Sequence, residues 1–112
     1  MADLIDVVRD AALDKKGEDF TTIDVSGRTI LADTFALVTG RSKIQTRAIA
    51  DEIAEKAEAA GQKVARMEGY ADGNWILIDL GHVIAHVFTP EQREFYNLER
   101  LWSEVEKRQA QG

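Results

Sequence analysis

The segment of residues 75–88 constrains the fold of this chain more than any other. It holds two apolar runs, Trp75–Leu80 and Val83–Phe88, joined directly by Gly81-His82. Two strand-like runs separated by a two-residue turn that contains glycine predict a β-hairpin. We therefore expect this hairpin to form part of a central sheet.

The rest of the chain alternates between helical and strand-like patterns. The expected helices cover residues 3–16, residues 42–61 and the residues from Pro90 onward. The other expected strands are Phe20–Val25, Thr34–Thr39 and Val64–Glu68. A short connection predicts antiparallel pairing of the first two strands along the chain. The strand–helix–strand order that follows predicts a right-handed crossover and a parallel pair between the second and third strands.

Two of the expected helices begin with a capping box, in which a hydroxyl and a glutamine three residues later bond to backbone N–H groups. The first box has the form S-x-x-Q and starts at Ser42, and the second has the form T-x-x-Q and starts at Thr89. The last helix should present one apolar face made of Phe95, Leu98, Leu101, Trp102 and Val105.

The predicted architecture is α/β, in the order α-β-β-α-β-β-β-α, with a five-stranded mixed sheet and three main helices. Helices that gather on one face leave the other open over an area on the order of several hundred square ångströms, a size that indicates a binding surface. Alternation along the fourth strand assigns Ile76 and Ile78 to the core and Trp75, Leu77 and Asp79 to the open face. Leu80, the next aliphatic residue, adjoins the turn, where either side is possible.

Composition limits the class of protein. A chain of 112 residues forms one domain, here residues 1–112, with a polar tail that we expect to fray from about residue 107. The net charge of −6 argues against sequence-independent binding to nucleic acid and favours a basic partner. The chain has no cysteine, which fits a reducing compartment, and no apolar run that predicts a membrane span or a secretory signal. A cytoplasmic location is expected.

The two histidines of the chain lie four residues apart and could indicate a metal site, but the geometry of a strand disfavours it. His82 and His86 lie on a turn and a strand, where four residues span roughly 13 Å, too far for one ion. We expect His86 to be a hydrogen-bonded residue of the sheet and His82 an exposed turn residue. No metal and no cofactor is predicted.

Enzymatic readings find little support. Thr39-Gly40-Arg41-Ser42 follows a strand and opens a helix, as a phosphate-binding loop does, but a good helix cap gives the same letters. A magnesium-dependent nucleotidyltransferase needs two carboxylates one residue apart on the next strand, which offers only Glu68. Such an enzyme, using Ser42 and Glu68, stays as an alternative. A self-associating adaptor that pairs its open face with a second copy is another.

Six phrases of the sequence, in order and over residues 3–103, resemble the ribosomal silencing factor family, also called Iojap or RsfS. They are Asp33-Thr34-Phe35-Ala36-Leu37-Val38-Thr39-Gly40, Ile49-Ala50-Asp51-Glu52-Ile53, Glu68-Gly69, Trp75-Ile76-Leu77-Ile78-Asp79-Leu80-Gly81, Val83-Ile84-Ala85-His86-Val87-Phe88 and Arg93-Glu94-Phe95-Tyr96-Asn97-Leu98-Glu99-Arg100-Leu101-Trp102.

The resemblance implies a protein that is not an enzyme, with a nucleotidyltransferase-like but non-catalytic fold. Members of the family bind the large ribosomal subunit through its fourteenth protein and block association with the small subunit when nutrients are scarce. Mitochondrial members act in large-subunit assembly, which is a further alternative. The protein is then expected to be a monomer when bound and a possible homodimer when free.

Carried over by position, the family's contact residues are Glu68, Trp75, Asp79, Leu80 and Tyr96, to which alternation adds Leu77. Trp75 is the expected apolar anchor, because a large ring contributes most to a partly buried interface. Glu68 and Asp79 would meet cationic side chains of the partner. The chain departs from the family pattern at His82, where an acidic or small polar residue is usual, and at Ala85, where a larger aliphatic residue is common.

Overall fold

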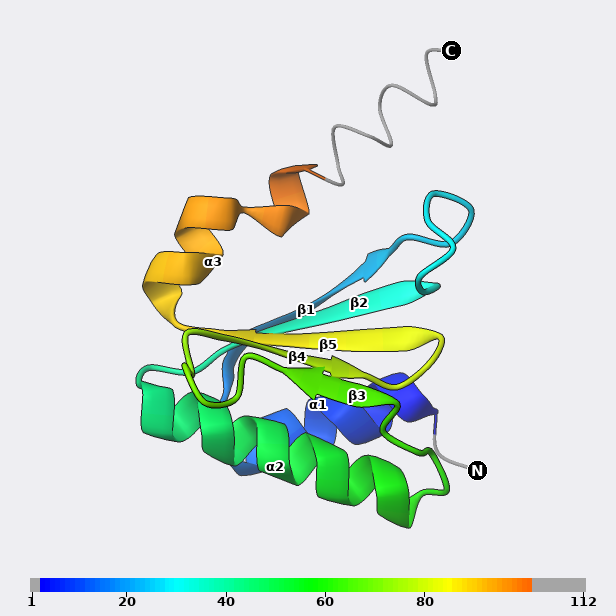
Figure 1. Cartoon of the computed structure of the whole chain (residues 1–112), viewed down its shortest axis with the longest axis horizontal. Coiled ribbons are helices and arrows are strands. Elements are labelled where there is room, and N and C mark those ends of the chain that lie inside the picture. Colours follow the sequence, from blue (N-terminus) through cyan, green and yellow to red (C-terminus); the bar gives the residue numbers. More distant parts are fainter. Residues whose placement is uncertain (1–2, 102–112) are drawn as a thin grey trace.

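The protein forms one five-stranded mixed sheet with helices on both sides, and the computed structural model describes residues 3–101 (Figure 1). The elements are α1 (Leu4–Asp14), β1 (Glu18–Asp24), β2 (Thr34–Thr39), α2 (Lys43–Ala59), β3 (Arg66–Glu68), β4 (Trp75–Asp79), β5 (Val83–Phe88) and α3 (Pro90–Tyr96). The predicted fold class and order of elements are confirmed. The tail predicted to fray lies outside the described residues.

The order of strands across the sheet is β1-β2-β5-β4-β3. The predicted β4–β5 hairpin and the antiparallel β1–β2 pair are confirmed. The predicted parallel pair of β2 with β3 is wrong, because β2 pairs in parallel with β5 instead. All six residues of β5 are buried, which suits a central strand, whereas β3 has three residues, two of them exposed, and suits an edge.

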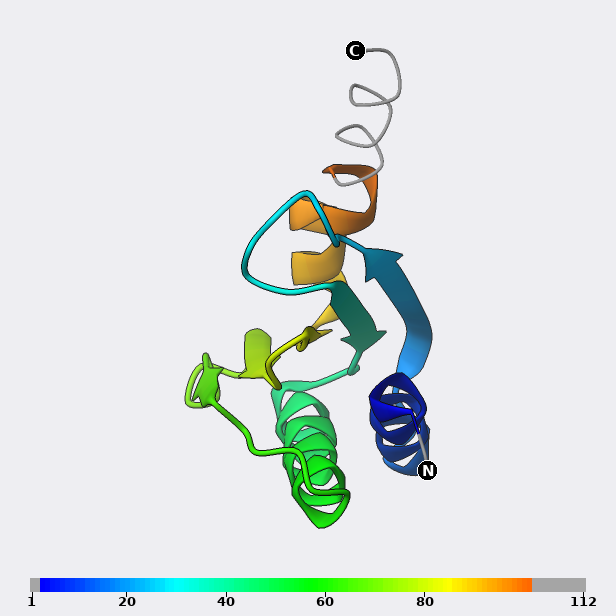
Figure 2. The ribbon, with the colours of Figure 1, turned by 90° about the vertical axis from the view of Figure 1, so that its right-hand side faces the viewer.

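Helices α1 and α2 cover one face of the sheet, as the two views show (Figures 1 and 2). The core between them contains Ile76, Ile78 and Leu80, as alternation predicted for the first two. At the start of α2 the Ser42 hydroxyl accepts a hydrogen bond from the Gln45 N–H, as the first capping box predicts. The side-chain oxygen Oε1 of Gln45 accepts from the Arg41 N–H. The side-chain amide of Gln45 donates to the backbone carbonyls of Lys15 and Lys16, directly after α1, so the cap also joins the two helices.

Helix α3 lies on the opposite side of the sheet from α1 and α2, together with the loop between β1 and β2 (Figure 2). The expectation that one face would be left open is therefore only partly met. The second capping box does not form, since the Thr89 side chain makes no capping hydrogen bond.

The continuous apolar face predicted for the last helix is also wrong within the described residues. Asn97 adopts φ 44°, which ends α3, and the chain turns helical again from Leu98. Leu98 packs against the sheet, whereas Phe95 is 80% exposed and Leu101 51% exposed. The break at Asn97 rotates the two segments, so their apolar residues cannot share one stripe. Trp102 and Val105 lie outside the described residues.

Candidate protein-binding surface

The face of the sheet turned away from α1 and α2 is called the second face. Strand register places Leu77 beside His86 and Leu37 in one row, and Asp79 beside Ile84 and Phe35 in the next. Its centre is a separate core cluster made of Val25, Ala32, Phe35, Leu37, Ile84 and Phe88. Trp75, Leu77, Ile23 and Leu98 are partly buried around that cluster. The second face is thus packed at its centre and accessible along the side formed by β3 and β4.

Trp75, the predicted anchor, is half-buried at the start of β4. Its ring centroid lies 5.3 Å from that of Phe88 in the sheet and 4.8 Å from that of Tyr96 in α3. Its indole N–H donates to Nδ1 of His86 over 3.0 Å. The polar edge of the indole is therefore turned inward, and the surface that it offers to a partner is apolar.

His86 is the hydrogen-bonded sheet histidine that the sequence predicts, and it is 4% exposed. Burial lowers the pKa of its imidazole to about 4, so the ring is neutral near pH 7. Because Nδ1 accepts from Trp75, the proton of the neutral ring resides on Nε2. Within residues 3–101, Nε2 is buried with no hydrogen-bond partner, an arrangement that costs about 1–3 kcal/mol. His82 lies exposed in the turn, as expected.

The two acidic residues of the predicted site flank one arginine. Arg66 Nη1 lies 3.4 Å from Glu68 Oε1, and its Nε lies 3.6 Å from Asp79 Oδ2. Asp79 also accepts a hydrogen bond from the Gly81 N–H, which fixes its carboxylate at the hairpin turn. The Arg66 and Glu68 side chains are more than half exposed, so these pairs contribute at most about 1 kcal/mol each.

The structure brings three of the predicted residues together around one depression. Its volume is about 290 Å³, and it is lined by Glu68, Gly69, Trp75 and Leu77. Tyr96 contacts the Trp75 ring at one side and is 48% exposed. An acidic group, an aliphatic side chain and two aromatic rings therefore meet at the accessible rim of the second face.

Leu80 does not belong to this surface. Its side chain is fully buried in the core between the sheet and the helices, so the prediction that it contacts a partner is corrected. Alternation explains the result, because Leu80 follows Ile76 and Ile78 on the same side of the chain. The turn at Gly81 begins one residue later and does not rotate it outward.

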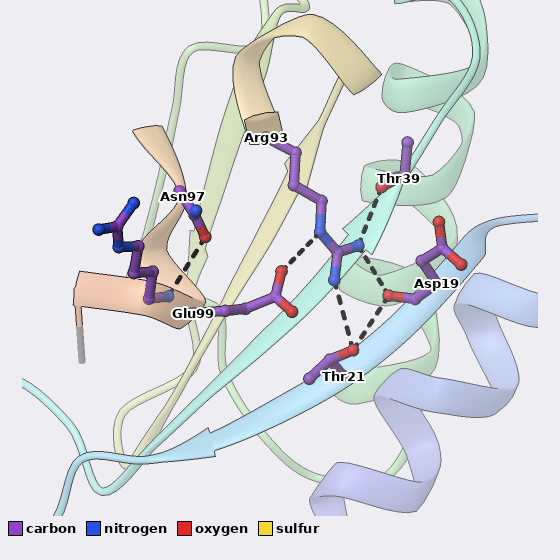
Figure 3. Close-up of polar contacts among 7 residues, drawn as sticks. Asp19, Thr21, Thr39, Arg93, Asn97 and Glu99 are labelled. Atoms are coloured by element: carbon purple, nitrogen blue, oxygen red, sulfur yellow. Dashed lines mark hydrogen bonds and ion pairs between the residues drawn. The ribbon is translucent and has the colours of Figure 1, made fainter. Parts of the chain in front are cut away.

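Arg93 holds α3 against the second face and was missed in the sequence (Figure 3). Its guanidinium donates to the Asp19 carbonyl and the Thr39 hydroxyl over 2.7 and 2.9 Å, and to the Thr21 hydroxyl over 3.3 Å. It also pairs with Glu99 over 2.9 Å, and its side chain is only 14% exposed. Three of these partners lie 54 to 74 positions away in sequence, so no local pattern predicts them.

Among residues 3–101, no three His, Asp or Glu side chains are grouped closely enough to hold a metal ion. No helix in that range combines the length and the apolar character needed to cross a bilayer.

Comparison with known proteins assigns the family. All of residues 1–112 match the family model described as "Ribosomal silencing factor during starvation". The chain belongs to the ribosomal silencing factor family. Ribosomal silencing factor RsfS of Bacillus subtilis is 40% identical over 102 residues, which cover 91% of this chain and 86% of that protein. The chloroplastic protein Iojap of Zea mays is 33% identical over 92 residues, which cover 82% of this chain and 40% of that longer protein.

A solved structure supports the fold of this member of the family. The crystal structure of a protein from Chromobacterium violaceum superposes with a TM-score of 0.87 at 34% sequence identity. The match covers 89% of this chain and 83% of that protein. The resemblance seen in the sequence and the fold class are thus confirmed together.

Proposed function

We propose that this ribosomal silencing factor docks on the large ribosomal subunit by the β3–β4 side of its second face, and so keeps the small subunit from joining. The fourteenth protein of the large subunit, implied by the family resemblance, is the proposed partner. The observation that carries the proposal is the half-buried Trp75, whose only polar side-chain atom, the indole nitrogen, donates inward to His86. The ring is thereby an apolar anchor at the rim of a depression.

The chemistry of this surface supports a protein partner. An aromatic residue in a partly desolvated pocket, with charges around it, is the usual composition of an energetically important contact. Glu68 and Asp79 offer carboxylates to lysines or arginines, whereas phosphate groups of RNA would be repelled by them and by the net charge of −6. A basic segment of a ribosomal protein fits both features.

The proposed mechanism is steric and contains no chemical step. The bound protein occupies space that the small subunit needs. The words "during starvation" in the family description are consistent with a response to scarce nutrients. Ser42, the serine of the nucleotidyltransferase alternative, accepts the capping hydrogen bond of α2, which supports a structural role. We further propose that the protein acts in the cytoplasm and binds the ribosome as a monomer.

Sedimentation with purified large ribosomal subunits tests the docking surface. Trp75→Ala should lose binding while its far-ultraviolet circular dichroism stays native, because the ring is at the rim and not in either core cluster. Ile44→Ala is the matched control, since Ile44 is 78% exposed on α2 at the other side of the sheet. Wild-type binding by Trp75→Ala would refute the proposed anchor.

A further inference from the structure

Packing alone does not account for a histidine at position 86, because the side chain is buried and one of its ring nitrogens is unpaired among the described residues. It lies in the middle of β5 and is 4% exposed, with the ring of Phe35 at 4.8 Å and that of Phe88 at 6.0 Å. In such surroundings a phenylalanine or a leucine would fill the space without burying an unpaired ring nitrogen. Nε2 is unpaired among the described residues. The polar contact of His86 is the hydrogen bond from Trp75, so that bond is what an apolar side chain could not supply.

The indole of Trp75 is held from three directions. His86 accepts from its N–H, Phe88 contacts it from the sheet, and Tyr96 contacts it from α3. The two aromatic contacts restrict the plane of the ring, but they are compatible with the N–H edge pointing inward or outward. The hydrogen bond distinguishes the two edges and selects the orientation in which the N–H is inside.

We infer that His86 is a positioning residue for Trp75, which raises affinity for the partner without contacting it. The inference rests on the proposed function, because it takes the Trp75 ring to be the anchor. A ring held in its bound orientation loses less conformational entropy on binding. The partner, in turn, needs an apolar pocket for the ring and no acceptor for the indole N–H.

Two substitutions separate positioning from packing. His86→Phe keeps a ring of similar size but removes the acceptor. His86→Asn keeps a carbonyl oxygen near the position of Nδ1 and should restore the bond. The signal of the Trp75 indole N–H in nuclear magnetic resonance spectra reports the bond in the free protein, and Trp75→Phe assigns it, since Trp102 is the other tryptophan.

The expected result is faster hydrogen exchange of the Trp75 indole N–H in His86→Phe, with slow exchange kept in His86→Asn. Affinity for purified large ribosomal subunits should fall on the order of tenfold in His86→Phe, as expected for one lost hydrogen bond, and recover in His86→Asn. The melting temperature of His86→Phe should stay close to that of the wild type, because removing the buried unpaired nitrogen offsets the loss of the hydrogen bond to the half-buried indole N–H. On a Trp75→Phe background, His86→Phe should have little further effect on affinity.

The possible failures are distinct. Unchanged indole exchange in His86→Phe would overturn the positioning role in the free protein. Faster exchange with wild-type affinity would overturn its importance for binding, provided that Trp75→Ala no longer binds. Wild-type binding by Trp75→Ala would instead refute the docking surface of the proposed function, whatever the exchange data show.

Discussion

The hydrogen bond between Trp75 and His86 determines what the second face offers to a partner. It places the indole N–H inside and leaves the apolar part of the ring at the rim. The bond requires a neutral imidazole, and burial provides one by lowering the pKa of His86 to about 4. A titratable side chain in the sheet thus acts as a fixed acceptor near neutral pH.

This state of His86 makes stability depend on pH. The ordinary pKa of 6.5 is lowered to about 4 in the folded protein, so between these values the unfolded chain binds more protons. The free energy of unfolding is therefore unaffected by the titration of His86 above pH 6.5. It falls by up to about 3 kcal/mol as the pH is lowered from 6.5 towards 4. Denaturant unfolding at several pH values measures this dependence. His86→Phe should remove the contribution of His86 to the slope of unfolding free energy against pH.

His82→Asn is the control for that experiment, because His82 is exposed in the hairpin turn. It should leave in place the pH dependence of stability that His86 contributes. Equal slopes in His86→Phe and the wild type would mean that His86 is not held neutral by the fold.

Sequence patterns predicted some residue roles and not others. Alternation along β4 separated Ile76 and Ile78 from Trp75 and Leu77, and the structure confirms both sides. The family resemblance places Leu80 on the contact surface, although its place in the alternation favours the core. The sequence does not predict the role of Arg93, because that role arises only when β1, β2 and α3 are brought together.

Helix α3 depends little on apolar packing, since none of its residues is buried. It is held by the hydrogen bonds and the ion pair of Arg93, by the contact of Tyr96 with Trp75 and by the Leu98 side chain that follows it. The irregular backbone of β1 assists, because Asp19 adopts φ 53° and its carbonyl accepts from Arg93. Helix α3 is thus positioned mainly by polar contacts.

Arg93→Ala should therefore lower the free energy of unfolding by about 2–3 kcal/mol, because it removes several largely buried hydrogen bonds. Arg41→Ala is the matched control. Its side chain is 74% exposed and pairs only with Glu18 in the described structure, so its loss should cost at most about 1 kcal/mol. Denaturant unfolding measures both, and equal costs would argue against the role given to Arg93.

Gly69 links β3 to the Trp75 site. It adopts φ +80°, and a Cβ placed there would run into the carbonyl oxygen of Trp75. Gly61 has a similar φ of +91° with no atom within 4 Å of such a Cβ. Gly61→Ala should cost about 1–2 kcal/mol of stability from backbone strain alone, and Gly69→Ala roughly 3 kcal/mol or more.

Thermal or denaturant unfolding of the two glycine variants tests this comparison. Gly69→Ala should also weaken binding to large ribosomal subunits, because the shifted carbonyl belongs to Trp75, whereas Gly61→Ala should bind as the wild type does. Equal stability of the two variants would show that the loop before Trp75 yields to the added methyl group.

Local sequence signals predicted the elements better than their pairing. Ser42 as the cap and Gly61 just past the end predict the bounds of α2. Gly81 predicts the hairpin turn, where it adopts φ 90°. The order of elements along the chain does not predict the parallel neighbour of β2, because two candidates follow it, β3 and β5. Only the burial of all six β5 residues decides between them, and that is a property of the assembled sheet.

The whole molecule is two-sided. One face of the sheet is covered by α1 and α2, and the second face is covered at one end by α3 and crossed by the loop between β1 and β2 (Figures 1 and 2). Within residues 3–101, the side of the second face formed by β3 and β4 is accessible, and it carries Glu68, Trp75 and Leu77. The family assignment, the acidic charge and this accessible rim all favour the proposed docking on a basic ribosomal protein.

The most direct test of this account mixes purified large and small ribosomal subunits and measures the fraction of joined ribosomes on a sucrose gradient. Wild-type protein and Ile44→Ala, added before mixing, should both reduce joining, whereas Trp75→Ala, folded and at the same concentration, should leave joining at the level seen without protein. Joining blocked equally well by Trp75→Ala would contradict the claim that the second face docks on the large subunit.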